Sequence, residues 1–238
     1  MVNIAINGVC GRMGKRILRL SKQDEQIKVV VGFEQKNHPE IGNKIDGVEI
    51  SADYNQIKQC DTIIDFSAPE ATTAMLKKVK DAKKSIVIGT TNLGKKQEAE
   101  IKEISKDIPI VYSPNMSVGV NLFFKILKTA ASVLGEYQAT IKEAHHIHKK
   151  DSPSGTAKKL ADIINKFDFD LGYDQIEAKR EGEIIGDHCV TFENDFDSFA
   201  IVHHAKTRNI FAQGAIIAAK WIKQKPAGLY SMEDVLFG

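Results

Sequence analysis

Short runs of valine and isoleucine alternate with helical stretches through the first half of this chain. The apolar runs are residues 2–7, 27–33, 61–67, 85–89 and 109–112. Helical stretches are expected between most of them, around 69–83 and 94–106. Continuous β-branched runs are typical of strands buried on both faces, and their alternation with helices indicates a parallel sheet. The first half is therefore predicted to be an α/β domain.

A long amphipathic helix, predicted over residues 118–134, separates this pattern from a different one. The strands that follow are expected over 138–146, 184–193 and 198–206, with one more starting near Ile176, and a single helix interrupts them at 155–167. This order predicts an α+β domain on a mixed, largely antiparallel sheet. An apolar helix over 209–223 is expected to return to the first domain, so the predicted domains are 1–116 with 209–238, and 117–208.

Composition argues against several function classes. The net charge of +2 comes without a basic tract, so we expect no nucleic-acid partner. No apolar run approaches the ~20 residues that a membrane span needs, so no membrane partner is expected either. The three cysteines show no CxxC spacing. They are typical of reduced thiols in a cytoplasmic protein.

A glycine-rich segment, Gly8–Gly14 (GVCGRMG), follows the first strand and opens the first helix. Glycines there permit a tight turn and let a pyrophosphate approach the backbone at a helix N-terminus. The spacing is G-x-x-G-x-x-G because Cys10 holds the middle place, and an ordinary glycine-rich turn is the alternative. Glu34, at the end of the second strand, lies where dinucleotide folds hold the adenosine ribose. The two features together predict a dinucleotide site.

Two more polar segments sit at the ends of predicted parallel strands. They are Gly89–Thr91 and Ser113–Met116. Ligands of open α/β sheets bind at the carboxyl edge of the strands, which places both segments at the predicted site. Ordinary turn chemistry is the alternative, since glycine, serine, proline and asparagine all favour turns.

The segment Glu143–Ala157 (EAHHIHKKDSPSGTA) is the most specific in the chain. It puts three histidines and two lysines within six residues and then opens into a helix through Ser-Gly-Thr. Histidine titrates near neutrality, lysine brings fixed charge, and a helix N-terminus offers free N–H groups to a carboxylate. The segment is therefore predicted to hold and protonate a small dianion.

Other interpretations of this segment remain open. His145, His146 and His148 could bind zinc, although side chains alternate along a strand and neither a cysteine nor an acidic residue at helical spacing is nearby. We predict no metal. The segment could also be a solvated basic loop, and Ser-Gly-Thr could simply cap its helix. The sequence does not separate Lys149 from Lys150.

Taken together, these motifs resemble the 4-hydroxy-tetrahydrodipicolinate reductase (dihydrodipicolinate reductase) family. The resemblance extends in order along nearly the whole chain. Beyond GVCGRMG, GTT, SPNMSVGVN and the histidine segment, it is carried by REGEIIGDH at 180–188, HHAKTRNIFAQGA at 203–215 and GLYSMEDVL at 228–236.

The resemblance implies a Rossmann-like dinucleotide-binding domain and a second domain that binds the substrate and mediates oligomerisation. Family members act in the diaminopimelate route to lysine. They reduce a cyclic imine dicarboxylate with NADH or NADPH, and water is lost from the hydroxylated precursor. They are usually homotetramers assembled through the second-domain sheet.

The resemblance also implies residue roles. His145 is the acid/base histidine and Lys149 the proton donor. His146 contacts a substrate carboxylate, and Gly155 and Thr156 bind the other end. The implied cofactor contacts are Gly8, Val9, Cys10, Gly11, Arg12 and Met13 for the pyrophosphate, Glu34 for the ribose, and Gly89, Thr90, Thr91, Ser113, Pro114, Asn115 and Met116 near the nicotinamide.

Two departures from the family pattern refine these expectations. Many relatives carry arginine after the ribose glutamate, where this chain has Gln35 followed by Lys36. We therefore expect NADH to be preferred over NADPH, with Lys36 pointing toward Glu34. The segment Phe167–Gln175 is shorter than in many relatives, which predicts weaker loop contacts between subunits. The rival hypotheses are another Rossmann oxidoreductase of an amino-acid precursor and a non-catalytic dinucleotide sensor.

Overall fold

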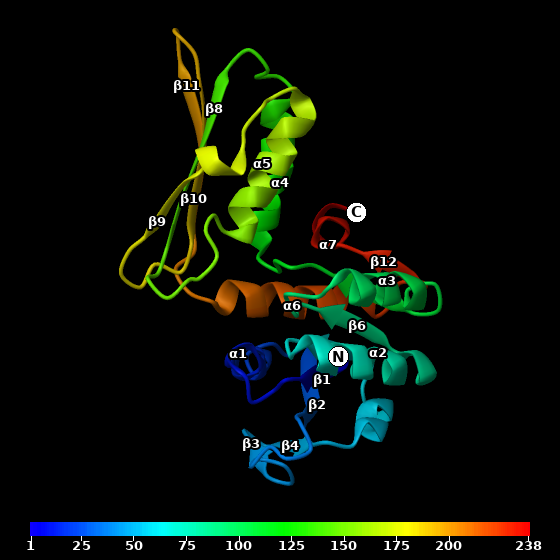
Figure 1. Cartoon of the computed structure of the whole chain (residues 1–238). Helices are drawn as coiled ribbons and strands as arrows, with labels where there is room; N and C mark the ends of the chain where they lie inside the picture. The colour runs from blue at the N-terminus through cyan, green and yellow to red at the C-terminus, as the bar shows by residue number, and fades with distance from the viewer. The chain divides into compact units, whose positions relative to one another are not determined.

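The computed structural model describes all 238 residues and divides into two compact units. Unit 1 comprises Met1–Val118 and Asn209–Gly238, and unit 2 comprises Gly119–Arg208 (Figure 1). Each unit contains one sheet, and the first is almost entirely parallel while the second is mixed. The predicted fold class, a Rossmann-like α/β domain with a second mixed-sheet domain, is confirmed. None of the helices combines the length and the apolar character needed to cross a bilayer.

The sheet of unit 1 has eight strands in the order β12-β7-β6-β5-β1-β2-β4-β3. All neighbouring pairs are parallel except β3 and β4. The strands are β1 (Val2–Asn7), β2 (Ile27–Phe33), β3 (Lys44–Ile45), β4 (Val48–Ser51), β5 (Thr62–Asp65), β6 (Ser85–Ile88), β7 (Pro109–Tyr112) and β12 (Gly228–Tyr230). The chain reverses its direction of travel at β1, which pairs with β2 on one side and β5 on the other.

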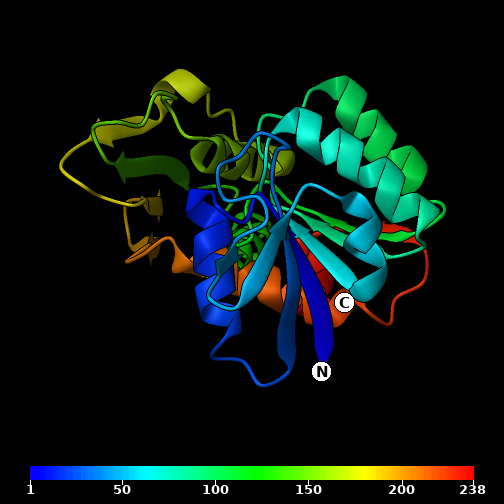
Figure 2. The ribbon, with the colours of Figure 1, turned by 90° about the horizontal axis from the view of Figure 1, so that it is seen from below.

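Helices cover both faces of this sheet because its apolar strands are buried on both sides. Ile4 and Ile6 face one cluster and Ala5 faces the other, as strand alternation requires. Figure 2 shows α1 (Arg12–Ser21) and α6 (Asn209–Ile222) on one side, and α2 (Pro69–Asp81) and α3 (Lys95–Ile104) on the other. The terminal helix α7 (Met232–Phe237) packs beside α6.

Unit 2 has a four-stranded sheet in the order β11-β10-β8-β9. Its strands are β8 (Gln138–His145), β9 (Glu177–Arg180), β10 (Asp187–Glu193) and β11 (Ser198–His204). Strands β8, β10 and β11 pair antiparallel, and β9 joins β8 in parallel. Ile141, Val190 and Phe192 form one face and pack against α4 (Val118–Ala131) and α5 (Gly155–Ile164).

Several element boundaries differ from the predictions. Strand β8 ends at His145, since a turn begins at Ile147, and β10 begins at Asp187 and not at 184. Helix α4 stops at Ala131, and α5 stops at Ile164, where a 3-10 turn continues to Phe167. The strands β3, β4 and β12, the helix α7 and the 3-10 helices at Tyr54–Gln59 and Tyr173–Gln175 were not predicted, because such short elements carry little periodicity.

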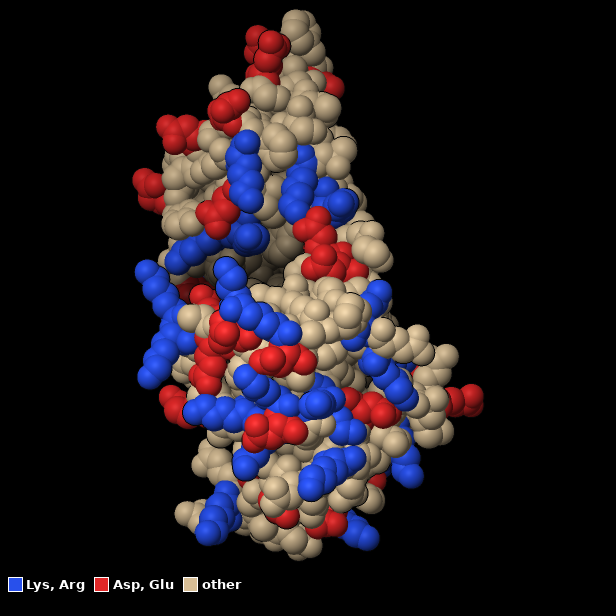
Figure 3. All heavy atoms as spheres, turned by 90° about the vertical axis from the view of Figure 1, so that its right-hand side faces the viewer, with Lys and Arg blue, Asp and Glu red and all other residues tan.

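Charged side chains of both signs are interspersed on one face of the molecule. On the face shown in Figure 3, lysine and arginine alternate with aspartate and glutamate without forming a continuous basic stripe. This face therefore lacks the uniformly basic surface that a nucleic-acid backbone selects.

Candidate functional site

The glycine-rich loop of unit 1 lies at the carboxyl edge of the sheet, where β1 passes into α1. Gly8 adopts φ +80°, and a Cβ there would lie 2.7 Å from the Phe66 carbonyl oxygen. A Cβ on Gly14 would lie 2.1 Å from the carbonyl oxygen of Gly8. Both positions therefore require glycine. Gly11 begins α1 without a side-chain cap, so the first N–H groups of the helix are available to an anion.

Glu34 contacts this loop directly. Its Oε1 accepts a hydrogen bond from the N–H of Cys10 at 2.7 Å, which joins the end of β2 to the turn after β1. A pocket of about 330 Å³ opens beside them, lined by Asn7, Gly8, Cys10, Gly11, Glu34, Gln35, His38, Tyr54, Phe66, Ser67, Ala68 and Ala71. The glycines, Cys10 and Glu34 were predicted from the sequence, whereas His38, Tyr54 and the Phe66–Ala68 turn were not. The turn could have been predicted from the position of Asp65-Phe-Ser at the end of a predicted strand, but no sequence pattern marked His38 or Tyr54.

A buried carboxylate joins three strand ends behind this pocket. Asp65 Oδ1 accepts hydrogen bonds from the Asn7 side chain at 3.0 Å, from the Ser67 N–H at 3.1 Å and from the Ser67 hydroxyl at 2.6 Å. The Ser67 N–H also donates to the Thr90 hydroxyl at 3.1 Å. Burial raises the pKa of Asp65 above its ordinary value. Thr90, expected as a cofactor contact, therefore also supports the turn that lines the pocket.

The remaining predicted cofactor residues fall into two groups. The side chains of Val9 and Met116 are buried in the core, so these residues offer a ligand only backbone atoms. Gly89 is buried against the ring of Phe66, and Ser113 donates from its hydroxyl to the Asn115 carbonyl at 2.8 Å. Arg12, Thr91 and Pro114 are exposed, and Met13 is half-buried.

Lys36 lies beyond the end of β2. The strand β2 ends at Phe33, so strand alternation no longer sets the direction of Lys36, and its side chain is exposed. Lys36 makes no ion pair with Glu34 and does not line the pocket. No contact supports the expectation that Lys36 points toward Glu34, and it stays a prediction.

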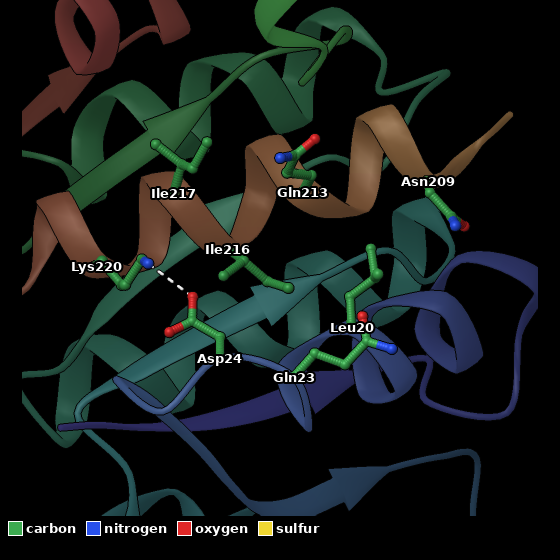
Figure 4. A pocket seen from close by; sticks show the side chains of 8 residues that line it. All are labelled: Leu20, Gln23, Asp24, Asn209, Gln213, Ile216, Ile217 and Lys220. Atoms are coloured by element: carbon green, nitrogen blue, oxygen red, sulfur yellow. Dashed lines mark hydrogen bonds and ion pairs between the residues drawn. The ribbon is translucent and has the colours of Figure 1, made fainter. Parts of the chain in front are cut away.

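A second pocket of unit 1 lies in the crevice between α1 and α6 (Figure 4). Its one ion pair joins Lys220 Nζ to Asp24 Oδ2 at 2.7 Å, and aliphatic and amide side chains make up the rest of its lining. The C-terminal end of α1 borders this pocket, whereas the glycine loop lies at the N-terminal end of the same helix. This crevice offers no unpaired charge and none of the predicted site residues.

In unit 2, the carboxylate of Glu143 is the centre of a buried network. Its side chain is completely buried. Oε1 accepts a hydrogen bond from the N–H of Ser154 at 3.0 Å and another from Arg180 Nη2 at 3.0 Å. Oε2 lies 2.5 Å from Nδ1 of His145, and these two atoms form an ion-pair contact without hydrogen-bond alignment. One carboxylate thus joins β8, β9 and the start of α5.

The charge balance around Glu143 follows from these partners. Burial pushes its pKa upward, but His145, Arg180 and Ser154 outweigh burial and lower the pKa to about 2. Glu143 is therefore ionised at neutral pH. Arg180 Nη2 also donates to the carbonyl oxygen of Asp151 at 2.6 Å, which fixes the loop before α5.

His188 on β10 completes the buried group. Its ring packs edge-on against His145, with the two centroids 5.2 Å apart, and its Nε2 lies 3.3 Å from the Ser154 hydroxyl. Burial, followed by the positive field of His145, lowers the pKa of His188 to about 4. Glu143, Arg180 and His188 lie in segments quoted above, but no role was predicted for them. Glu143 could have been found, because it lies two residues before His145 on the same face of a strand.

Lys149 follows the strand and is mostly buried, whereas Lys150 is exposed. Lys149 Nζ lies 2.7 Å from Oδ1 of Asp151. Burial raises the pKa of Asp151, but the Lys149 ammonium and the backbone N–H of Gly155 outweigh burial and lower it. Lys149 therefore already holds one carboxylate in the loop just before α5. The structure thus separates the two lysines that the sequence could not.

The three predicted histidines do not converge. His145 is buried inside the network, His146 follows the strand with its Nε2 3.1 Å from Arg208 Nη2, and His148 is exposed. Burial, with the positive charge of Arg208, lowers the pKa of His146. Thr156 lies in the first turn of α5, and the Ser154 hydroxyl caps this helix by accepting from the N–H of Ala157.

Glu143, His145 and His188 place three potential metal-ligand atoms within 4.8 Å of one another. The separation of 2.5 Å between His145 Nδ1 and Glu143 Oε2 is shorter than the ~3.3 Å expected of two ligands of a tetrahedral zinc ion. The Arg180 guanidinium also neutralises the same carboxylate. The geometry favours an acid–base network over a metal centre.

The two halves of the chain match the two parts of one family. Residues 2–116 match the family profile "Dihydrodipicolinate reductase, N-terminus", and residues 119–236 match "Dihydrodipicolinate reductase, C-terminus". The chain belongs to the dihydrodipicolinate reductase family. The family named from the sequence motifs is thereby confirmed, and the chain is an oxidoreductase.

Curated relatives match this chain along nearly their whole length. The 4-hydroxy-tetrahydrodipicolinate reductase of Geobacter sp. (strain M21) is 38% identical, over 99% of this chain and 99% of its own. That of Pelagibacter ubique is 40% identical, over 99% and 98%. A solved dipicolinate-bound dihydrodipicolinate reductase from Paenisporosarcina sp. TG-14 superimposes with a TM-score of 0.85 at 20% identity, covering 98% of both chains, and shows the same fold.

Acid should destabilise the fold through two groups of unit 2 in turn. The ordinary pKa of 6.5 for His188 falls to about 4 in the fold, so its stabilisation, complete above pH 6.5, is lost as the pH falls toward 4. Glu143 acts in the same direction between pH 4.5 and about 2. His188→Gln should flatten the fall in the free energy of unfolding between pH 6.5 and 4, measured by urea unfolding and circular dichroism. His148→Gln, at a residue 72% exposed, is the control, and an equal slope in His188→Gln and wild type would contradict this prediction.

Proposed function

We propose that this chain reduces 4-hydroxy-tetrahydrodipicolinate to tetrahydrodipicolinate, with NADH or NADPH, in the diaminopimelate route to lysine. The observation that carries the proposal is the Glu143–His145 network beside Lys149 and the start of α5, in a chain that matches the reductase family over both halves. Unit 1 is the dinucleotide-binding domain and unit 2 the substrate-binding domain in this proposal.

The residues of unit 1 fit a dinucleotide. Gly8 and Gly14 leave no room for a Cβ, and their tight turn lets the loop Gly8–Met13 approach a pyrophosphate closely. The uncapped start of α1 supplies N–H donors. Glu34 uses Oε1 for Cys10 and keeps Oε2 for a ribose hydroxyl. Gly89–Thr91 and Ser113–Met116 follow neighbouring strands at the same edge and line the nicotinamide side. The nicotinamide, when bound, supplies the hydride.

The residues of unit 2 fit a dicarboxylate. Lys149 holds the carboxylate of Asp151 just before the start of α5, so the same cation, together with the N–H groups of the helix start, can hold a substrate carboxylate. Gly155 and Thr156 open this helix. His146 contacts the other carboxylate of the substrate in this proposal. A small dianion with two separated carboxylates matches these donors better than a neutral substrate does.

The proton chemistry falls to His145 and Lys149. Loss of water from 4-hydroxy-tetrahydrodipicolinate gives a conjugated imine. Hydride addition to this imine builds negative charge on the substrate, and a nearby cationic acid stabilises that charge and neutralises it by giving up a proton. Lys149 carries a proton for this step, held in the loop by its contact with Asp151. His145 acts as the acid/base group, with an ionised carboxylate behind its ring.

The two rival functions explain less of the structure. Another Rossmann oxidoreductase accounts for the glycine loop but not for a histidine–lysine pair beside a helix start. A non-catalytic dinucleotide sensor needs neither His145 nor Lys149. Purified protein mixed with NADH and then with enzymatically generated substrate separates the three, because only the proposed enzyme oxidises NADH in a substrate-dependent way.

We also propose that the enzyme is a cytoplasmic homotetramer assembled through the sheet of unit 2. The face of this sheet opposite α4 and α5 carries small or β-branched uncharged residues at its centre, among them Thr140, Cys189, Thr191, Ala200 and Val202, with the charged Lys142 beside Cys189. An outer sheet face of this composition is typical of a covered surface. All three cysteines are free thiols, in keeping with a cytoplasmic location.

His145→Ala and Lys149→Ala should each lower kcat about 10²–10⁴-fold while NADH still binds, because both residues belong to unit 2 and the glycine loop to unit 1. Steady-state rates with saturating substrate, together with NADH fluorescence titrations, measure the two effects. Lys150→Ala is the matched control, since this lysine is exposed, and it should retain wild-type turnover. A variant of His145 or Lys149 that keeps more than about a tenth of kcat would show that its role is misassigned.

Cofactor choice should favour NADH several-fold in kcat/KM. A 2′-phosphate would bring about two negative charges beside Glu34, and like charges a few ångströms apart repel. Gln35 lines the pocket but cannot offset them, whereas Gln35→Arg adds a bidentate fork and should narrow or reverse the preference. Asn37→Arg adds the same charge two residues away, outside the pocket lining, and should change the ratio less. A wild-type enzyme that prefers NADPH would refute this prediction.

The assembly can be tested by light scattering at micromolar concentration, where we expect a tetramer. Val202→Lys places a charge on the proposed interface and should produce smaller species. Val133→Lys makes the same change at a valine that is 75% exposed beyond α4, and it should leave the mass unchanged. A monomeric wild-type protein would reject the assembly.

A further inference from the structure

We propose that Glu143 is a positioning residue that sets the proton-bearing nitrogen of His145 and, with the same carboxylate, fixes the start of α5. The inference deepens the proposed function, because it assigns the residue through which the acid/base histidine and the carboxylate-binding helix are held together. It rests on the contacts within unit 2 and on the chemistry of a carboxylate.

Glu143 sets the direction of the His145 ring. Glu143 and His145 are two residues apart on β8, so their side chains emerge on the same face of the sheet. An ionised carboxylate can only accept hydrogens, so the nitrogen that faces it, Nδ1, carries the proton. In the neutral ring Nε2 is then unprotonated and able to accept a proton. The tautomer of His145 is therefore fixed by Glu143.

Gly186 leaves space at the opposite ring nitrogen, Nε2 of His145. A Cβ on Gly186 would lie 3.0 Å from His145 Nε2, tighter than ordinary contact. Glycine at this position keeps a side chain away from the nitrogen that exchanges the proton. Nδ1 is thus directed at Glu143, and Nε2 at a position kept clear of side chains.

The other oxygen of the same carboxylate, Oε1 of Glu143, holds the start of α5. Oε1 accepts from the N–H of Ser154, the N-cap residue of α5, and from Arg180 Nη2, which also binds the Asp151 carbonyl. The helix start and the loop that carries Asp151 therefore take their position from Glu143. A shift of the carboxylate would move the acid/base histidine and the helix start together.

The charged and titratable neighbours of His145 are few. Glu143 and His146 lie near it along its own segment, Arg180 is its register partner on β9, and His188 packs on its ring from β10. Among these four, Glu143 is the one negative group. Removing its charge should therefore make the imidazolium form of His145 less favourable.

The decisive variant is Glu143→Gln. Ser154 and Arg180 both donate to Oε1, so the amide oxygen must remain there and the amide NH₂ must face Nδ1. His145 is then forced into the Nε2–H tautomer, and its titration midpoint should move to lower pH by one unit or more. Both changes are read in the substrate-free protein by ¹⁵N correlation spectra of the histidine rings. Glu177→Gln, at a surface glutamate of β9 paired with Lys142, is the matched control and should leave both signals unchanged.

Activity provides a second readout. In Glu143→Gln we expect kcat to fall at least 10-fold, the acidic limb of the pH–rate profile to shift to lower pH, and KM for NADH to stay unchanged. If the wild type shows no substrate-dependent NADH oxidation, the proposed function fails while the ring spectra still test the positioning. If Glu143→Gln proves unfolded, the wild-type spectrum decides alone. An Nε2–H tautomer in the wild type, or an unchanged tautomer and titration in a folded Glu143→Gln, overturns the proposal.

Discussion

A buried negative charge constrains most of unit 2. The carboxylate of Glu143 has no exposed surface, so its desolvation must be offset by partners that cannot move away. These partners come from three elements: His145 on its own strand, Arg180 on β9 and the N–H of Ser154 before α5. The pairing of β9 with β8 brings Arg180 opposite His145, and this short strand is therefore as much a part of the site as the histidine segment itself. Removing one partner leaves the charge uncompensated, which typically costs about 3–5 kcal/mol.

Unit 1 uses a buried carboxylate in the opposite electrostatic setting. The partners of Asp65 are the neutral donors Asn7 and Ser67, and burial raises its pKa. Glu143 has cationic partners, and its pKa is lowered to about 2. The first arrangement fixes the turn that lines the unit 1 pocket and uses only neutral partners. The second pairs a buried negative charge with a histidine and an arginine.

Much of the fold could be predicted from the sequence because its strands are continuous apolar runs. β1, β2, β5, β6 and β7 fall on the predicted segments, and the eight-stranded sheet follows from their alternation with helices. The glycine loop and Glu34 were also recognisable, since a close approach of backbone requires residues without a Cβ at a fixed place. Strands of two to four residues, such as β3 and β12, have no such pattern and are set by tertiary pairing.

Only part of the candidate site could be predicted from the sequence, for a different reason. Clustered histidines and lysines indicate a site by their composition, but Arg180 and His188 lie 35 and 43 residues after His145 along the chain. Only the register of β9 and β10 against β8 brings them to it. The metal site was judged on the same incomplete information. No acidic residue lies at helical spacing to the histidines, but the strand places Glu143 beside His145 at a spacing of two residues.

The short connection between α5 and β9 bears on how copies of the chain associate. Two hydrogen bonds close this connection internally. The Asn165 side chain donates to the Leu171 carbonyl at 3.0 Å and accepts from the Leu171 N–H at 3.1 Å. Tyr173 donates to Asp162 at 2.6 Å, which ties the 3-10 turn back to α5. A segment that satisfies its polar groups locally has few left for a neighbouring subunit. The outer face of the unit 2 sheet, where Val202 and Ala200 leave apolar surface without a covering element, is the surface we propose for association.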